Sequence, residues 1–126
     1  MEPKHILVVD DDPVDLELLS EILIGAGYRV STAKSSIEAL KLAKRGSVDL
    51  ALVDLLMPGI DGYSLIGMLT RDRMFKAPVL VISGRVEEKD AKRALDTGAV
   101  GFVAKPVDGK DLVARVEELI NRDNIQ

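Results

Sequence analysis

Five short strand-like segments, separated by stretches with helical periodicity, constrain the fold of this chain more than any other feature. Four of them are almost entirely apolar: Ile6–Val9, Leu50–Val53, Val79–Ile82 and Val100–Ala104. The fifth, Tyr28–Ala33, alternates apolar and polar residues. Continuous Val, Ile and Leu runs are typical of parallel strands covered on both faces, and an alternating run is typical of a half-exposed strand.

Apolar residues at helical spacing follow each predicted strand. The first helix has Asp12 and Pro13 as its N-cap and first residue, and Gly25 and Gly27 end it. The other predicted helices cover Ser36–Arg45, Tyr63 to about Arg73, Glu87–Thr97 and Gly109–Arg122. The fourth of the five helices has a thin apolar stripe, formed by Ala91, Ala94 and Leu95.

Strand and helix alternate five times, which predicts a (βα)5 chain with one parallel five-stranded sheet between two layers of helices. The alternating second strand ends in Ala33, which has no chemistry to offer. This places the second strand at an edge and favours the strand order 2-1-3-4-5. With 126 residues, we expect one domain over residues 1–126 with its core at about residues 5–122.

Four of the strands end on residues suited to phosphate and metal chemistry: Asp10 with Asp11, then Asp54, Ser83 and Lys105. The carboxyl ends of parallel strands lie on one edge of the sheet, where open α/β folds bind ligands. Carboxylate oxygens are suitable ligands for Mg²⁺, and an aspartate beside such an ion can act as a nucleophile toward phosphorus. A lysine and a hydroxyl can bind the oxygens of the transferring phosphoryl group.

Four motifs stand in order along the chain: Val9-Asp10-Asp11-Asp12-Pro13, Val53-Asp54 with Met57-Pro58-Gly59-Ile60-Asp61-Gly62, Ile82-Ser83-Gly84, and Lys105-Pro106. In this arrangement the chain resembles a response-regulator receiver domain of two-component signalling, similar to chemotaxis regulators. The resemblance covers essentially the whole sequence. It implies a flavodoxin-like three-layer sandwich with the same strand order, 2-1-3-4-5, so that order is not independent of the resemblance.

The resemblance also implies a role for each residue. Asp54 is the expected acceptor of a phosphoryl group from a histidine kinase, and Mg²⁺ is expected on Asp10, Asp11, Asp54 and the backbone carbonyl of Leu56. Ser83 and Lys105 are expected to bind the phosphoryl oxygens. Such a domain is not a conventional enzyme, since it catalyses only its own phosphorylation and dephosphorylation.

Switching is implied to pass from the Ser83 hydroxyl to the aromatic ring of Phe102. Two residues depart from the commoner family pattern, because Ser83 stands where threonine is frequent and Phe102 where tyrosine is frequent. The resemblance further implies a cis peptide bond before Pro106. Leu56 and Arg85, two residues beyond Asp54 and Ser83, are expected to flank the route of a hydrolytic water.

Composition excludes several other classes of protein. The chain has no cysteine, which excludes disulfides and thiol chemistry, and its net charge of −4 argues against a dedicated nucleic-acid binder. No apolar segment is long enough to span a membrane, and the N-terminus does not resemble a signal peptide. We therefore expect a cytoplasmic protein without direct nucleic-acid or membrane contact.

The expected partners are a sensor histidine kinase or phosphotransfer protein, and a downstream target or an output domain. The output is expected to contact the face of the fourth helix, fifth strand and fifth helix, with the domain monomeric or dimeric on phosphorylation. The sequence shows no DNA-binding, cyclase or kinase segment after the last helix.

Alternative readings remain at this point. On local chemistry alone, Asp10 to Asp12 fit turn and cap residues, Ser83 a strand-end hydroxyl and Lys105 a solvated lysine. Asp10-x-Asp12 also resembles the haloacid-dehalogenase phosphatases, with Asp10 as nucleophile and Asp12 as acid/base, but this leaves Asp54 without a role. A flavodoxin requires a phosphate-binding loop, which the acidic residues after the first strand would oppose. A receiver-like module that works without phosphorylation usually lacks an acid-pocket residue.

Overall fold

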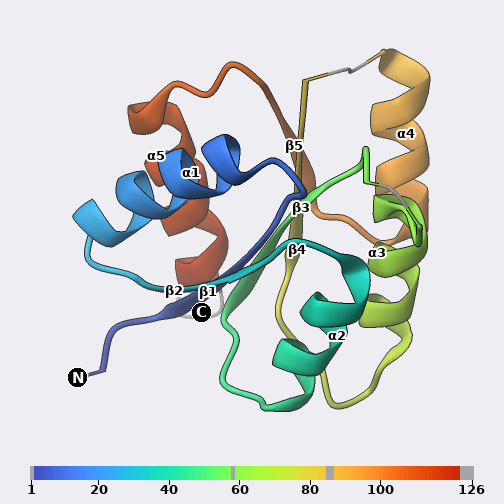
Figure 1. Ribbon diagram of the computed structural model, residues 1–126, viewed down its shortest axis with the longest axis horizontal. Coiled ribbons are helices and arrows are strands. Elements are labelled where there is room, and N and C mark those ends of the chain that lie inside the picture. The colour runs from blue at the N-terminus through green and yellow to red at the C-terminus, as the bar shows by residue number, and fades with distance from the viewer. Residues whose placement is uncertain (1, 58, 85–86, 123–126) are drawn as a thin grey trace.

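The computed structural model describes residues 2–57, 59–84 and 87–122. Five parallel strands form one sheet in the order β2-β1-β3-β4-β5, and five helices connect them (Figure 1). The strands are β1 (His5–Val9), β2 (Arg29–Ala33), β3 (Leu50–Asp54), β4 (Val79–Ser83) and β5 (Gly101–Ala104). The helices are α1 (Pro13–Gly25), α2 (Ser36–Lys44), α3 (Gly62–Arg71), α4 (Glu88–Thr97) and α5 (Gly109–Asn121).

The helices form two layers, with α1 and α5 on one face of the sheet and α2, α3 and α4 on the other (Figure 1). The strands β1, β3 and β4 are buried along almost their whole length, whereas β2 is partly exposed, as expected of an edge strand. The predicted fold class and strand order are therefore confirmed.

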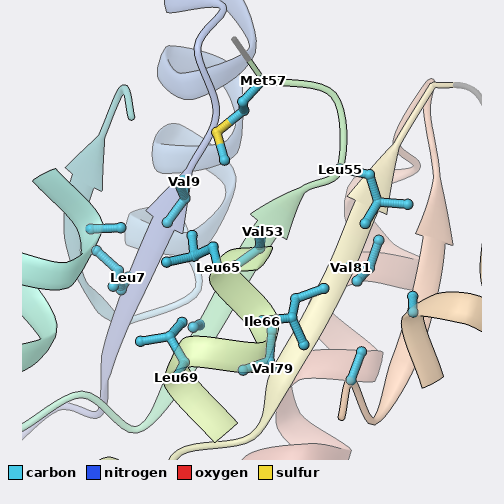
Figure 2. Packing of buried hydrophobic residues seen from close by; sticks show 14 of the residues in the cluster. Leu7, Val9, Val53, Leu55, Met57, Leu65, Ile66, Leu69, Val79 and Val81 are labelled. Carbon is cyan, nitrogen blue, oxygen red and sulfur yellow. The ribbon is translucent and has the colours of Figure 1, made fainter. Parts of the chain in front are cut away.

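The alternation of side chains along each strand divides the core into two clusters. Figure 2 shows the cluster under α3, where Leu65, Ile66 and Leu69 of the helix pack over strand residues such as Val53 and Val81. On the opposite face, α1 and α5 pack over the intervening strand residues. No helix within the described residues is both long and apolar enough to cross a membrane.

The helices begin where the sequence supplies capping side chains. Asp12, Ser35 and Asp61 each accept a hydrogen bond from a backbone N–H of the first turn of their helix, and Asp108 does the same for α5. Because Asp61 is the cap of α3, that helix begins at Gly62, one residue earlier than predicted, and it ends at Arg71 rather than near Arg73.

Three predictions for the last two helices need correction. In α4 only Ala94 is buried, and Leu95 is 50% exposed, so the apolar stripe is thinner than predicted. Glu87 is the N-cap residue of α4 rather than its first residue, and α5 ends one residue before Arg122.

Candidate functional site

The sheet brings the four predicted strand-end residues to its carboxyl edge. Asp10 follows β1, Asp54 and Ser83 are the last residues of β3 and β4, and Lys105 follows β5. Asp10, Asp54 and Ser83 are buried, and buried polar or ionised side chains usually have hydrogen-bond partners. The order of the strands places β1 and β3 side by side, so the two buried carboxylates are neighbours.

Lys105 joins these strand ends. Its Nζ donates hydrogen bonds to Asp10 Oδ2 at 2.7 Å and to Asp54 Oδ2 at 3.0 Å. A third bond, at 2.8 Å, reaches Asp15 Oδ2 in the first turn of α1. The backbone N–H of Lys105 donates to the carbonyl of Ser83 at 2.9 Å, which ties the end of β4 to the same site. The peptide bond between Lys105 and Pro106 is cis, as predicted.

The acid residues have the chemistry of a site for a hard divalent cation. Asp10, Asp11 and Asp54 each place one carboxylate oxygen within 4.8 Å of the others. Oxygen ligands of this kind fit Mg²⁺, which commonly takes one or two carboxylates together with water and phosphate oxygens. The backbone N–H of Leu56 donates to Asp54 Oδ1 at 3.0 Å, which fixes the orientation of that carboxylate.

Burial and charge shift the pKa values of two groups in the site. Burial raises the pKa of Asp10, and the charge of Asp54 adds to this, against the hydrogen bonds from Lys105 and from the backbone of Asp12. Burial would lower the pKa of Lys105, but its hydrogen bonds to Asp10, Asp15 and Asp54 outweigh burial and raise that pKa. The ammonium is therefore firmly charged and counters part of the negative charge.

The remaining predicted residues lie near this centre or at its margin. Asp12 caps α1 by accepting from the N–H of Val14, as expected for a capping residue, and its own N–H donates to Asp10 Oδ1. Phe102 is half-buried in β5 and packs against the core cluster on the α4 side of the sheet. Arg85 lies outside the described residues.

Asp15 was missed by the sequence reasoning. Acidic residues are common in the first turn of a helix, because they interact favourably with the helix dipole. The type and position of Asp15 therefore did not indicate a role in the site. Its contact with Lys105 joins residues that are 90 positions apart in the chain.

Comparison with known proteins gives the family of the chain. Residues 6–117 match the response regulator receiver domain. The regulator RpaA of Synechocystis, described as a DNA-binding dual master transcriptional regulator, is 36% identical over 94% of this chain and 49% of its own length.

This chain belongs to the response-regulator receiver domain family. A receiver-domain protein from Methanospirillum hungatei superposes with a TM-score of 0.90 and 28% identity, and covers 97% of each chain. The receiver domain of sensor histidine kinase PA1611 of Pseudomonas aeruginosa, whose structure has a magnesium ion in its active-site cleft, gives a TM-score of 0.87 and 27% identity over 94% of this chain and 98% of its own.

Receiver domains act in two-component signalling and are not conventional enzymes. They bind Mg²⁺ at an acidic pocket, and the trio of Asp10, Asp11 and Asp54 has the donor set for it. The chain spans about half the length of the curated relatives it matches.

Proposed function

We propose that this receiver domain accepts a phosphoryl group on Asp54 from the phosphohistidine of a sensor kinase or phosphotransfer protein, in a Mg²⁺-dependent reaction. The observation that carries the proposal is the position of Asp54. Its buried carboxylate accepts from Lys105 through Oδ2 and from the N–H of Leu56 through Oδ1, and it lies beside the carboxylates of Asp10 and Asp11. Asp10 is bonded to Lys105 and to a backbone N–H in the same way, but its side chain is fully buried. The side chain of Asp54 is 7% exposed and ends the central strand, between the acid pair and Ser83.

The transfer exchanges one bond to phosphorus for another. A carboxylate oxygen of Asp54 bonds to phosphorus while the P–N bond of phosphohistidine breaks and its electron pair leaves with the imidazole. Mg²⁺, when bound, neutralises the charge on the phosphoryl oxygens. We propose that Asp10, Asp11, Asp54 and the carbonyl of Leu56 hold the ion.

Lys105 and Ser83 complete the proposed site. Lys105 exchanges its bond with Asp54 for a bond to a phosphoryl oxygen, which keeps the ammonium paired as the carboxylate loses its charge. Ser83 supplies a hydroxyl from the buried end of β4, and Phe102 in the adjacent strand responds to its movement.

We further propose that the output passes through the face formed by α4, β5 and α5 to a target protein or an output domain, in the cytoplasm. This is supported by the weak packing of α4, in which Ala94 is the buried residue. Association of two domains through this face on phosphorylation is part of the same proposal.

The test is labelling by acetyl phosphate in Mg²⁺, followed by intact mass spectrometry. The wild-type protein should gain one phosphoryl group, EDTA should prevent it, and Asp54→Ala should abolish it. Asp12→Asn keeps a capping oxygen and should still be labelled, whereas the dehalogenase-type alternative requires Asp12 as its acid/base. Labelling of Asp54→Ala would contradict the proposal and favour Asp10 as the nucleophile.

A further inference from the structure

Asp15 gives this site a fourth carboxylate that belongs to neither the metal-binding trio nor the proposed acceptor. Its Oδ2 lies 2.8 Å from Lys105 Nζ, and its side chain is 33% exposed. A lysine ammonium has three N–H donors. With Asp10, Asp15 and Asp54 as partners, all three donors of Lys105 are directed at carboxylates before a phosphoryl group arrives.

The charges around Lys105 favour a cation over an anion. Asp10, Asp11, Asp15 and Asp54 contribute four negative charges when ionised, against one positive charge on the ammonium. Each carboxylate attracts a divalent cation and repels the oxygens of a phosphoryl group. On transfer, Asp54 becomes an acyl phosphate and the other members of the trio bind the ion, but Asp15 keeps its full charge beside Lys105.

We propose that Asp15 is a positioning residue that competes with the phosphoryl group for Lys105, so that it strengthens binding of Mg²⁺ and weakens binding of the phosphoryl group. This inference rests on the proposed function of Asp54. Asp15 engages one N–H of the ammonium, so that this donor is not available to the oxygens of the incoming group. It also reduces the competition of Lys105 with Mg²⁺ for Asp10 and Asp54.

The test compares two affinities in one variant. Asp15→Asn keeps the shape of the side chain and one oxygen acceptor but removes its charge. Mg²⁺ affinity is measured by NMR titration of backbone amides, and beryllofluoride, a mimic of the phosphoryl group, is then titrated at saturating Mg²⁺. We expect the dissociation constant for Mg²⁺ to rise about threefold to tenfold, and that for beryllofluoride to fall by a similar factor.

Opposite changes in the two affinities separate positioning from structural support. Loss of a structural residue would weaken both, and that result, or no change in either, would overturn the proposal. Asp15→Glu keeps the negative charge, so both affinities should stay close to those of the wild type. Glu17→Gln removes one charge from an exposed position on the same helix and should leave both unchanged.

Failure of the underlying function has a different signature. In that case the wild-type protein binds no beryllofluoride in Mg²⁺, or Asp54→Ala binds it as well as the wild type does. Either result overturns the assignment of Asp54, and the role of Asp15 with it. Mg²⁺-dependent binding that requires Asp54, together with unchanged affinities in Asp15→Asn, overturns the role of Asp15 alone.

Discussion

Asp10 carries its carboxylate in a fully buried position, and the free energy of unfolding should reflect this. Burial, helped by the charge of Asp54, raises its pKa above the ordinary value of 3.8. A carboxyl with a raised pKa in the folded state stabilises the fold at pH values below its ordinary pKa. That contribution is lost as the pH rises through the raised pKa.

Asp10→Asn removes the buried charge that lowers stability above the raised pKa. We therefore expect this variant to have a melting temperature a few degrees higher than the wild type at pH 7 in EDTA. The difference from the wild type should shrink as the pH falls, because protonation of the wild-type carboxyl then removes the cost of burying its charge. Thermal melts followed by circular dichroism at the two pH values measure it, with Glu17→Gln as the control. A lower melting temperature for Asp10→Asn at pH 7 would mean that pairing with Lys105 outweighs the cost of burial.

The identities of most site residues could be predicted because each ends a strand. Asp54 and Ser83 are the last residues of buried strands, and parallel strands have their carboxyl ends on one edge, so the sequence order alone indicates convergence. Asp15 could not be predicted in this way, since its contact depends on the path of the chain after β5 and on the tilt of α1. Neither is encoded in a local pattern.

Gly62 links the start of α3 to the strand end that presents Asp54. A Cβ at this position would collide with the backbone carbonyl oxygen of Asp54 and with the Cα of Leu55. Both are backbone atoms that cannot move aside as a flexible side chain can. The helix therefore approaches the site as closely as it does because residue 62 has no side chain.

We expect Gly62→Ala to lower the free energy of unfolding by about 1–3 kcal/mol, the usual cost of overpacking. Urea unfolding measures this. Gly25→Ala is the matched control, because Gly25 is also helical and has no atom within 4 Å of an added Cβ. That control should be neutral or stabilising by about 0.4–1 kcal/mol. Equal stability of Gly62→Ala and the wild type would contradict the close approach.

The types of all ten elements could be predicted, but some of their ends could not. Capping decides the ends: Asp61 caps α3 and Glu87 caps α4, and each shifts the helix start by one residue from the predicted position. The exposure of Leu95 was also not predictable, because the helical stripe of α4 gives its periodicity but not its rotation about its own axis. That rotation depends on its packing against both α3 and β5.

At the scale of the whole molecule, the strand order was predictable because a single strand, β2, alternates polar and apolar residues. β1, β3 and β4 are buried along almost their whole length and β5, at the other edge, is partly exposed. The mutual order of these four strands came from the resemblance as much as from their composition. The prediction that residues of about 5–122 form the whole core stays a prediction.

We expect α4 to move readily, because its described side-chain contacts with α3 are mainly polar. The two helices lie side by side in Figure 1, yet α4 buries only Ala94. Tyr63 of α3 donates long hydrogen bonds to Asp90, at 3.3 Å to Oδ1 and 3.4 Å to the backbone carbonyl. Arg93 lies 4.0 Å from the centre of the Tyr63 ring. Such partly buried polar contacts each stabilise by about 1 kcal/mol, so they hold α4 more weakly than an apolar core would.

We therefore expect Mg²⁺ and beryllofluoride to change hydrogen exchange mainly in α4, β5 and α5. The site reaches these elements through the strand ends, because Ser83 pairs with Ala104 at the junction of β4 and β5, two residues from Phe102. Phe102 has no hydroxyl group that water could hydrate when the ring faces solvent. The ring should therefore favour its buried position once space opens beside Ser83. Asp54→Ala should show no such change under the same conditions. A response confined to α2 and α3 would contradict this route. These helices connect β2 to β3 and β3 to β4, so neither precedes or follows β5 in the chain.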